Sequence, residues 1–297
     1  MTEIIKRNQI AAFFLFTFLI SWTVWIGVGI IGQDPDSPLV LLGVYGPTLA
    51  AVIVSGIVGK GVAIRKLLRG VILWRVGIQW YAIALLGPWI LELLSIGIYS
   101  SLSGTIPDVP LPSVGAVAGA ILTTLLLNIL IPGLGEEPGW RGFALTRLQG
   151  RWSPVAASLG IGLVWAVWHF PGYWMGIGIH NAPPLLFVVW VLPLAGLIAW
   201  VFNSAKGSIL LAILFHASLN TTIGLLPFLP SEADVPISTE LIGQLGLTGE
   251  LYGPYRVFTI LLWISFISVA LITKGRLGHP DNDESEGDKG LSRQGEL

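Results

Sequence analysis

The stretch Gly135-Glu136-Glu137-Pro138-Gly139-Trp140-Arg141 places two adjacent carboxylates and a guanidinium in a chain that is otherwise strongly apolar. On insertion scales, each such charge costs about 2.5 to 3.5 kcal/mol at the centre of a membrane-spanning helix. Ionisable groups at that depth usually serve function, which is therefore the first hypothesis to test. The alternative is a cytoplasmic helix end that neutralises its own charges and holds the bundle in place.

The residues around this stretch determine the fold class. Of the 297 residues, 54% are hydrophobic and 11% are charged, whereas an ordinary soluble domain has about 25% charged residues. The apolar residues form runs of about 20, the length of helix that crosses a hydrocarbon core of about 30 Å. The sequence therefore predicts an all-α fold, a polytopic membrane bundle of about eight transmembrane helices.

The predicted spans alternate with short polar or basic connections. The helix that carries Glu136 and Glu137 would be about 55 Å long if it continued unbroken from Val114 to Gly150. That length is nearly twice the apolar thickness, so the segment must tilt, protrude or break, and Pro132, Gly133 and Gly135 indicate a break just before the carboxylates. The eight spans are Ile10–Ile31, Leu39–Val58, Ile78–Ser100, Val114–Ile131, Pro154–Phe170, Pro184–Phe202, Ser208–Leu226 and Tyr255–Thr273.

The basic residues orient these spans, because Lys and Arg collect on the cytoplasmic side of a membrane. With the N-terminus inside, all of the 16 Lys and Arg residues except Arg256 fall on the inner side. We therefore expect an integral, multi-pass protein of a prokaryotic plasma membrane with both termini cytoplasmic. The basic segment Gly59–Gly77 is interpreted as a plain inner loop, with a helix lying on the anionic leaflet as the alternative.

Composition also divides the chain. Residues 1–277 are predicted to form the transmembrane bundle, with the motif-bearing region at about 121–224. Residues 278–297 are rich in Asp, Glu, Gly and Ser, and so little apolar surface predicts a disordered cytoplasmic tail. The chain contains no cysteine and no basic block suited to nucleic acid. Disulfides, thiolate metal sites and a cysteine nucleophile are thereby excluded.

Three polar pairs stand at helical spacing within the apolar runs. Glu137 and Arg141, Trp165 and His169, and His216 and Asn220 are each four residues apart, so each pair projects from one face of its helix. In a helical hairpin turning at Gly150-Arg151-Trp152-Ser153-Pro154, Glu136 and His169 both lie about 23 to 26 Å from the turn. His216 lies about 15 Å from Lys206 and is predicted to be shallower than His169.

These groups are suited to hydrolysis by water if they converge. A carboxylate beside a histidine can hold and deprotonate a water, which makes Glu136 with His169 a candidate base pair. Arg141 would neutralise Glu137, and His216 and Asn220 can donate hydrogen bonds to the oxyanion of a hydrolysed amide. No Ser-His-Asp set stands out, and the His-Glu-x-x-His zinc signature is absent.

The same residues resemble the CPBP family, which comprises type II CAAX prenyl endopeptidases and bacteriocin-processing proteases and is also known as the Abi family. Its pattern is Glu-Glu-x-x-x-Arg, then Phe-x-x-x-His, then His-x-x-x-Asn or Asp on successive membrane helices. Here Trp165 replaces the usual Phe and keeps an aromatic wall. The resemblance implies catalytic roles for Glu136, His169, His216 and Asn220, with Glu137 and Arg141 in support.

The resemblance further implies a glutamate-type intramembrane endopeptidase that processes CAAX-type or leader peptides near the cytoplasmic face. Its partners would be a peptide or protein substrate, with or without a lipid modification, and the lipid bilayer, with no nucleic acid. No cofactor is required in the preferred interpretation, but zinc at Glu136, His169 and His216 is chemically possible. The alternatives are a non-proteolytic membrane scaffold or bacteriocin-immunity protein, and a proton-coupled transporter that would use Glu92.

Overall fold

The computed structural model describes residues 2–32, 37–104, 113–175, 182–226 and 253–280. Within these ranges the secondary structure is helical throughout, with no strand, and it confirms the predicted polytopic bundle. Seven helices are long and apolar enough to cross a membrane, and the eighth predicted span is the 17-residue helix α12. The predicted tail falls almost entirely on residues 281–297, which lie outside the described residues.

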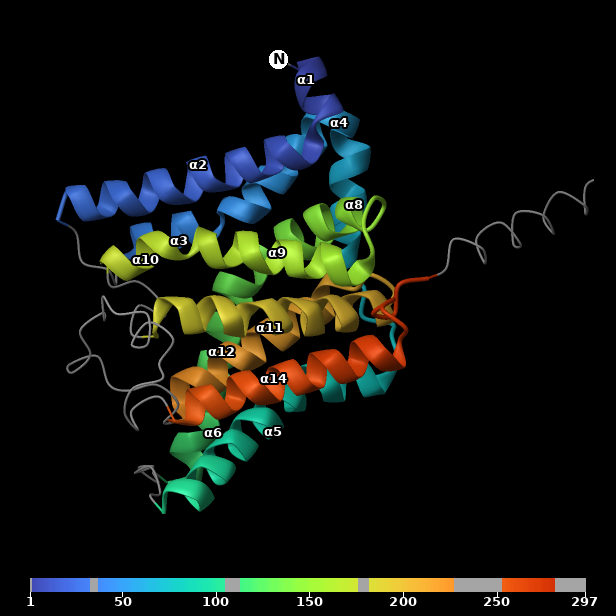
Figure 1. Cartoon of the computed structure of the whole chain (residues 1–297). Helices are drawn as coiled ribbons and strands as arrows, with labels where there is room; N and C mark the ends of the chain where they lie inside the picture. The colour runs from blue at the N-terminus through green and yellow to red at the C-terminus, as the bar shows by residue number, and fades with distance from the viewer. Residues whose placement is uncertain (1, 33–36, 105–112, 176–181, 227–252, 281–297) are drawn as a thin grey trace, which may run out of the picture.

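Figure 1 shows the helices of the described ranges in chain order. Their bounds are α1 Thr2–Arg7, α2 Gln9–Ile30, α3 Pro38–Val44, α4 Gly46–Val71, α5 Ile78–Ser103, α6 Val114–Asn128, η1 Ile129–Gly133, α7 Leu134–Glu137, η2 Pro138–Leu145, α8 Thr146–Leu148, α9 Pro154–Trp168, α10 Phe170–Met175, α11 Pro184–Ser204, α12 Ile209–Leu225 and α14 Gly253–Ile272.

The bundle is arranged with its most apolar span at the centre. Helix α11 is the most buried of the spans and packs against α9, α12 and α14. The outer helices present large aliphatic side chains outward: Leu15 and Leu19 on α2 and Ile260 and Ile264 on α14 are 53–58% exposed. A soluble protein would bury such side chains, so these faces are the ones that contact lipid.

One end of the bundle gathers the basic connections. In Figure 1 the start of α2, the helix α8 and the end of α14 lie at the same end of the bundle. Helix α4 bends at Gly59 and Lys60, where Lys60 has φ 51°, and its second half runs across this end (Figure 1). The segment that we interpreted as an inner loop is therefore helical as far as Val71. We call this end of the molecule the basic end.

The helix that carries the carboxylates is continuous from Val114 to Leu148, so the expected break is wrong. The chain widens into the π-helical stretches η1 and η2, which contain Pro132 and Pro138. Proline has no N–H for the usual hydrogen bond to the carbonyl four residues earlier. A π-turn accommodates it, because the π-helical hydrogen bonds span five residues and do not require that bond. The carbonyl of Leu134, four residues before Pro138, instead accepts from the hydroxyl of Thr48 on α4 at 2.8 Å.

The end of α3 and the start of α4 approach this helix very closely. A Cβ atom added to Gly139 would lie 2.5 Å from the backbone of Pro47, and one added to Gly135 would lie 2.9 Å from the carbonyl oxygen of Val44. No side chain fits at either position, because real Cβ contacts are longer. The two glycines thus fix the rotation of the helix and turn Glu136 and Glu137 toward α9 and α12.

Candidate active site

Four predicted site residues line a single cavity of about 340 Å³ within the bundle. Glu136 comes from α7, His169 from the end of α9, and His216 and Asn220 from α12. Glu136 and His216 are buried, with 3% of each residue exposed. The polar groups of three separate helices therefore meet around one cavity, as the helical spacing had suggested.

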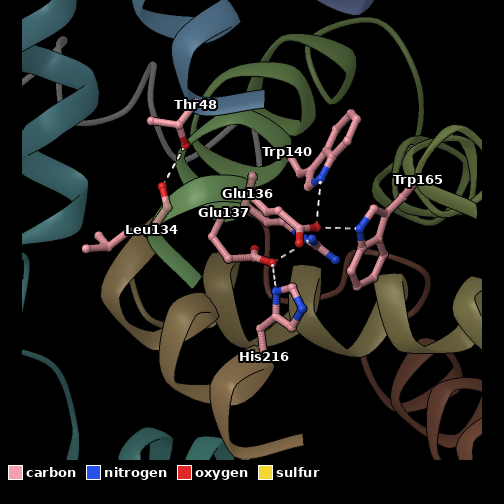
Figure 2. A network of polar contacts seen from close by, with 8 residues as sticks. Thr48, Leu134, Glu136, Glu137, Trp140, Trp165 and His216 are labelled. Carbon is pink, nitrogen blue, oxygen red and sulfur yellow. Dashed lines mark hydrogen bonds and ion pairs between the residues drawn. The ribbon is translucent and has the colours of Figure 1, made fainter. Parts of the chain in front are cut away.

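The carboxylate of Glu136 is held by two indoles. Its Oε2 atom accepts a hydrogen bond from Nε1 of Trp165 at 2.6 Å and a longer one from Nε1 of Trp140 at 3.4 Å. Figure 2 shows both indoles converging on this oxygen. Since both bonds end on Oε2, Oε1 keeps its lone pairs for a molecule in the cavity.

Glu137 lies behind Glu136 and joins two of the other elements. Its Oε1 accepts from Nη1 of Arg141 at 2.9 Å and from Nδ1 of His216 at 2.8 Å (Figure 2). The side chains of Glu137 and Arg141 are fully buried, and the Arg141 guanidinium lies 4.8 Å from the centre of the Trp165 ring. The supporting pair is therefore formed, and Glu137 also orients an imidazole, a contact that the sequence interpretation did not include.

The hydrogen bond of His169 sets its tautomer. Its Nδ1 lies 2.8 Å from the carbonyl oxygen of Trp165, which can only accept, so Nδ1 carries the proton. In the neutral ring the lone pair is then on Nε2. The ring packs edge-on against Trp168 and Phe187, with centroids 4.8 Å and 5.4 Å away. His169 is thus a fixed acceptor in the cavity wall.

The predicted depth mismatch of His216 is absorbed by the packing of its helix. Helix α12 packs against η1 and α7, so His216 reaches Glu137, the second carboxylate. The ring of Trp165 stands edge-on to His216 at 5.3 Å and separates it from His169. Asn220, one turn further along α12, is half-buried and lines the cavity.

The arrangement can be tested against the proposed zinc ligands. Within the described part of the chain, no three His, Asp or Glu side chains are grouped as a metal site. Each of the three proposed ligands has one donor atom engaged within the protein: Oε2 of Glu136 with two indoles, Nδ1 of His169 with the Trp165 carbonyl, and Nδ1 of His216 with Glu137. No step is derived through the ion.

The cavity extends away from the basic end. Its walls include Trp25 near the end of α2, Gly172 on α10, and Ile223 and Gly224 in the last turn of α12. All of these lie toward the opposite end of the helices that carry them. The helix that carries the carboxylates continues to Leu148, so Glu136 and Glu137 lie well inside the bundle.

The sequence interpretation missed the indole donors. Trp165 was identified as an aromatic wall and Trp140 was given no role, yet both hydrogen-bond to Glu136. Helical spacing did hold a signal, because Trp140 lies four residues after Glu136 on the same helix. The contact between α9 and α7 that brings Trp165 to Glu136 is tertiary and has no signal in spacing.

Residues 118–222 match the model of the family described as "Type II CAAX prenyl endopeptidase Rce1-like". The protein named CAAX prenyl protease 2 from Methanococcus maripaludis is 32% identical over 111 residues, which cover 32% of this chain and 38% of that protein. The alignment thus spans less than half of the relative's length. The family match includes all three motif elements, and the two comparisons together confirm the resemblance to the CPBP family over this part of the chain.

Proposed function

We propose that the protein is an intramembrane endopeptidase that hydrolyses a peptide bond with a water activated by Glu136. The observation that carries this proposal is the convergence of a carboxylate, two imidazoles and an amide from three helices on one cavity of about 340 Å³. Ligand cavities of roughly this size, mostly apolar with a few convergent polar groups, are typical of active sites. The family match of the region that contains these residues adds support.

The first step is attack by water on the substrate carbonyl. Oε1 of Glu136 takes one proton of the water, while Nε2 of His169 accepts a hydrogen bond from the other and orients the oxygen. The two indoles on Oε2 hold the carboxylate in position without competing for the water, because they occupy the other oxygen. The product of this step is a tetrahedral intermediate with negative charge on the former carbonyl oxygen.

The second step requires donors for that charge and a proton for the leaving amine. Asn220 can donate from its amide, and His216 can donate from Nε2 when both ring nitrogens carry protons. Glu137, bonded to Nδ1 of His216, is then the counter-ion of the ring. As the C–N bond breaks, Glu136 returns its proton to the amine nitrogen, so that the base is regenerated and one water is consumed.

Glu137 and Arg141 act on this chemistry through their neighbours. Their ion pair spans one helical turn, and both side chains are fully buried. A buried pair of this kind is strongly destabilised when one partner is removed. We assign it the task of fixing His216 and of keeping a second charge away from Glu136, in agreement with its supporting role in the family pattern.

The substrate is a peptide or protein that enters from the bilayer and is either CAAX-type, and so lipid-modified, or a leader peptide. The printed name of the relative from Methanococcus maripaludis favours the CAAX-type substrate. The cavity walls also favour it, because most of the lining is aromatic or aliphatic, including Trp25, Trp190 and Leu194. We propose a metal-independent, glutamate-type reaction in a multi-pass protein with a cytoplasmic basic end.

The test is peptide cleavage by the purified protein with Glu136→Gln, a substitution of nearly equal volume that cannot accept the proton. We expect kcat to fall at least about 100-fold, since general acid–base catalysis contributes about 10²–10⁴. A farnesylated CAAX peptide and a leader peptide should be assayed in parallel. Undiminished cleavage by the variant would remove Glu136 as the base.

A membrane scaffold or bacteriocin-immunity protein is the competing function. It is favoured if the wild-type protein cleaves neither peptide while His169→Ala and His216→Ala abolish folding. A proton-coupled transporter would require a relay of ionisable groups, and Glu92 on α5 is a buried acid that does not line the cavity. Glu92→Gln should leave cleavage unchanged if hydrolysis is the function.

A further inference from the structure

A second cavity, of about 510 Å³, opens at the basic end between the N-terminal helices and α8. We propose that it binds the phosphate-ester headgroup of an anionic phospholipid from the inner leaflet. We call it the headgroup pocket. It does not touch the candidate active site and does not depend on peptide hydrolysis. Its lining residues are Lys6, Arg7, Asn8, Gln9, Ile10, Ala11, Phe14, Arg147, Leu148, Arg151 and Trp152.

Positive charge in the pocket is not balanced by its own walls. Lys6, Arg7, Arg147 and Arg151 all line it, and among its described lining residues there is no Asp or Glu. Glu3 lies nearby and forms an exposed ion pair with Lys6 at 2.7 Å, a contact of little strength in water. The remaining guanidiniums favour an anion, and phosphate oxygens match their planar donor geometry.

Arg147 is held in position before any ligand binds. Its Nε donates to Oε1 of Gln9 at 3.0 Å, and its Nη1 donates to the carbonyl oxygen of Phe143 at 3.0 Å. The guanidinium also lies 3.6 Å from the centre of the Phe143 ring. Arg147 therefore has little side-chain entropy left to lose when a ligand binds. Its Nη2 takes no part in these contacts and can donate to the ligand.

The apolar part of the pocket favours a lipid over a free anion. Ile10, Phe14 and the 53% exposed Trp152 line it beside the cations. Helix α2 begins at Gln9, so Ile10 and Phe14 occupy the first turns of a membrane span, where headgroups meet acyl chains. Trp152 precedes α9, the span that begins at Pro154. Basic pockets of this kind on the cytoplasmic side bind acidic headgroups, and tryptophan is enriched at that interface.

The test is titration of the purified full chain in detergent with dioleoyl phosphatidylglycerol, followed by native mass spectrometry. We compare the wild type with Arg7→Gln/Arg151→Gln, a pair of exposed side chains whose loss leaves Arg147 and the core intact. We expect the apparent affinity for phosphatidylglycerol to fall about tenfold or more, because each interfacial cation contributes substantially to acidic-lipid binding. Zwitterionic dioleoyl phosphatidylcholine should bind weakly to both proteins.

The matched control is Arg65→Gln/Arg69→Gln, which removes the same charge from exposed positions of α4 at the same end but outside the pocket. Its affinity should remain within about twofold of the wild type. An equal loss of affinity in this control would indicate nonspecific attraction to the basic surface and would refute binding in the headgroup pocket. Displacement of the lipid by inorganic phosphate or glycerol phosphate at similar concentration would identify a free phosphate as the ligand and refute the proposal that the ligand is a lipid.

Discussion

Replacing Trp165 by Phe removes the shortest hydrogen bond to the proposed base. The indole Nε1 lies 2.6 Å from Oε2 of Glu136, and both residues are buried. A hydrogen bond to a charged group contributes about 1.5–3 kcal/mol, and each 1.36 kcal/mol is a factor of ten in rate. Nε1 of Trp140 lies 3.4 Å from the same oxygen in the wild-type structure and can partly replace the lost hydrogen bond. We therefore expect kcat to fall roughly 10- to 30-fold.

The substitution is structurally mild, because Phe is the residue that the family pattern has at this position. The aromatic ring that contacts His216 and the Arg141 guanidinium is kept in shortened form. The measurement is steady-state cleavage of a fluorogenic peptide by purified Trp165→Phe protein, with kcat and KM determined separately. A fall in kcat with little change in KM would indicate that Glu136 is held less well during the reaction.

Trp190→Phe provides the matched control. Trp190 lines the same cavity, and its Nε1 has no hydrogen-bond partner in the described part of the chain. The substitution removes the same indole volume without removing a hydrogen bond, and kcat should stay within about twofold of the wild type. If Trp165→Phe also stays within twofold, the indole does not position the base. If both variants lose activity equally, cavity shape and not hydrogen bonding is responsible.

Three further predictions concern the surrounding residues. Arg141→Met should lower the thermal unfolding midpoint, because the buried Glu137 carboxylate loses its guanidinium partner, and the free energy of unfolding should fall by about 3–5 kcal/mol. Adding Glu137→Gln should restore most of this loss. Asn220→Ala should keep the fold but reduce kcat about 100-fold in peptide cleavage if its amide serves the oxyanion. Gly139→Ala should destabilise the protein by about 1–3 kcal/mol through its clash with α4, whereas Gly97→Ala, with open space around it, should be neutral or stabilising in the same unfolding measurement.

The sequence was sufficient to predict the helical bundle, because apolar run length and basic connections follow directly from the bilayer. It failed on the helix that carries Pro132 and Pro138. Proline and glycine indicate a break when only α-helical geometry is considered, but a neighbouring hydroxyl can satisfy the freed carbonyl, as Thr48 does for Leu134. That compensation comes from another helix and leaves no mark on the local sequence.

The candidate site was likewise predictable in its members but not in its connections. Helical spacing grouped Glu137 with Arg141, and the ion pair is present at 2.9 Å. Spacing within one helix cannot indicate which carboxylate meets α12, because that depends on how two helices rotate against each other. The close approach of α3 at Gly135 and of α4 at Gly139 sets that rotation. It directs Glu137 to His216 and leaves Glu136 to face the cavity, and the division of roles between two adjacent identical residues is therefore a consequence of tertiary packing.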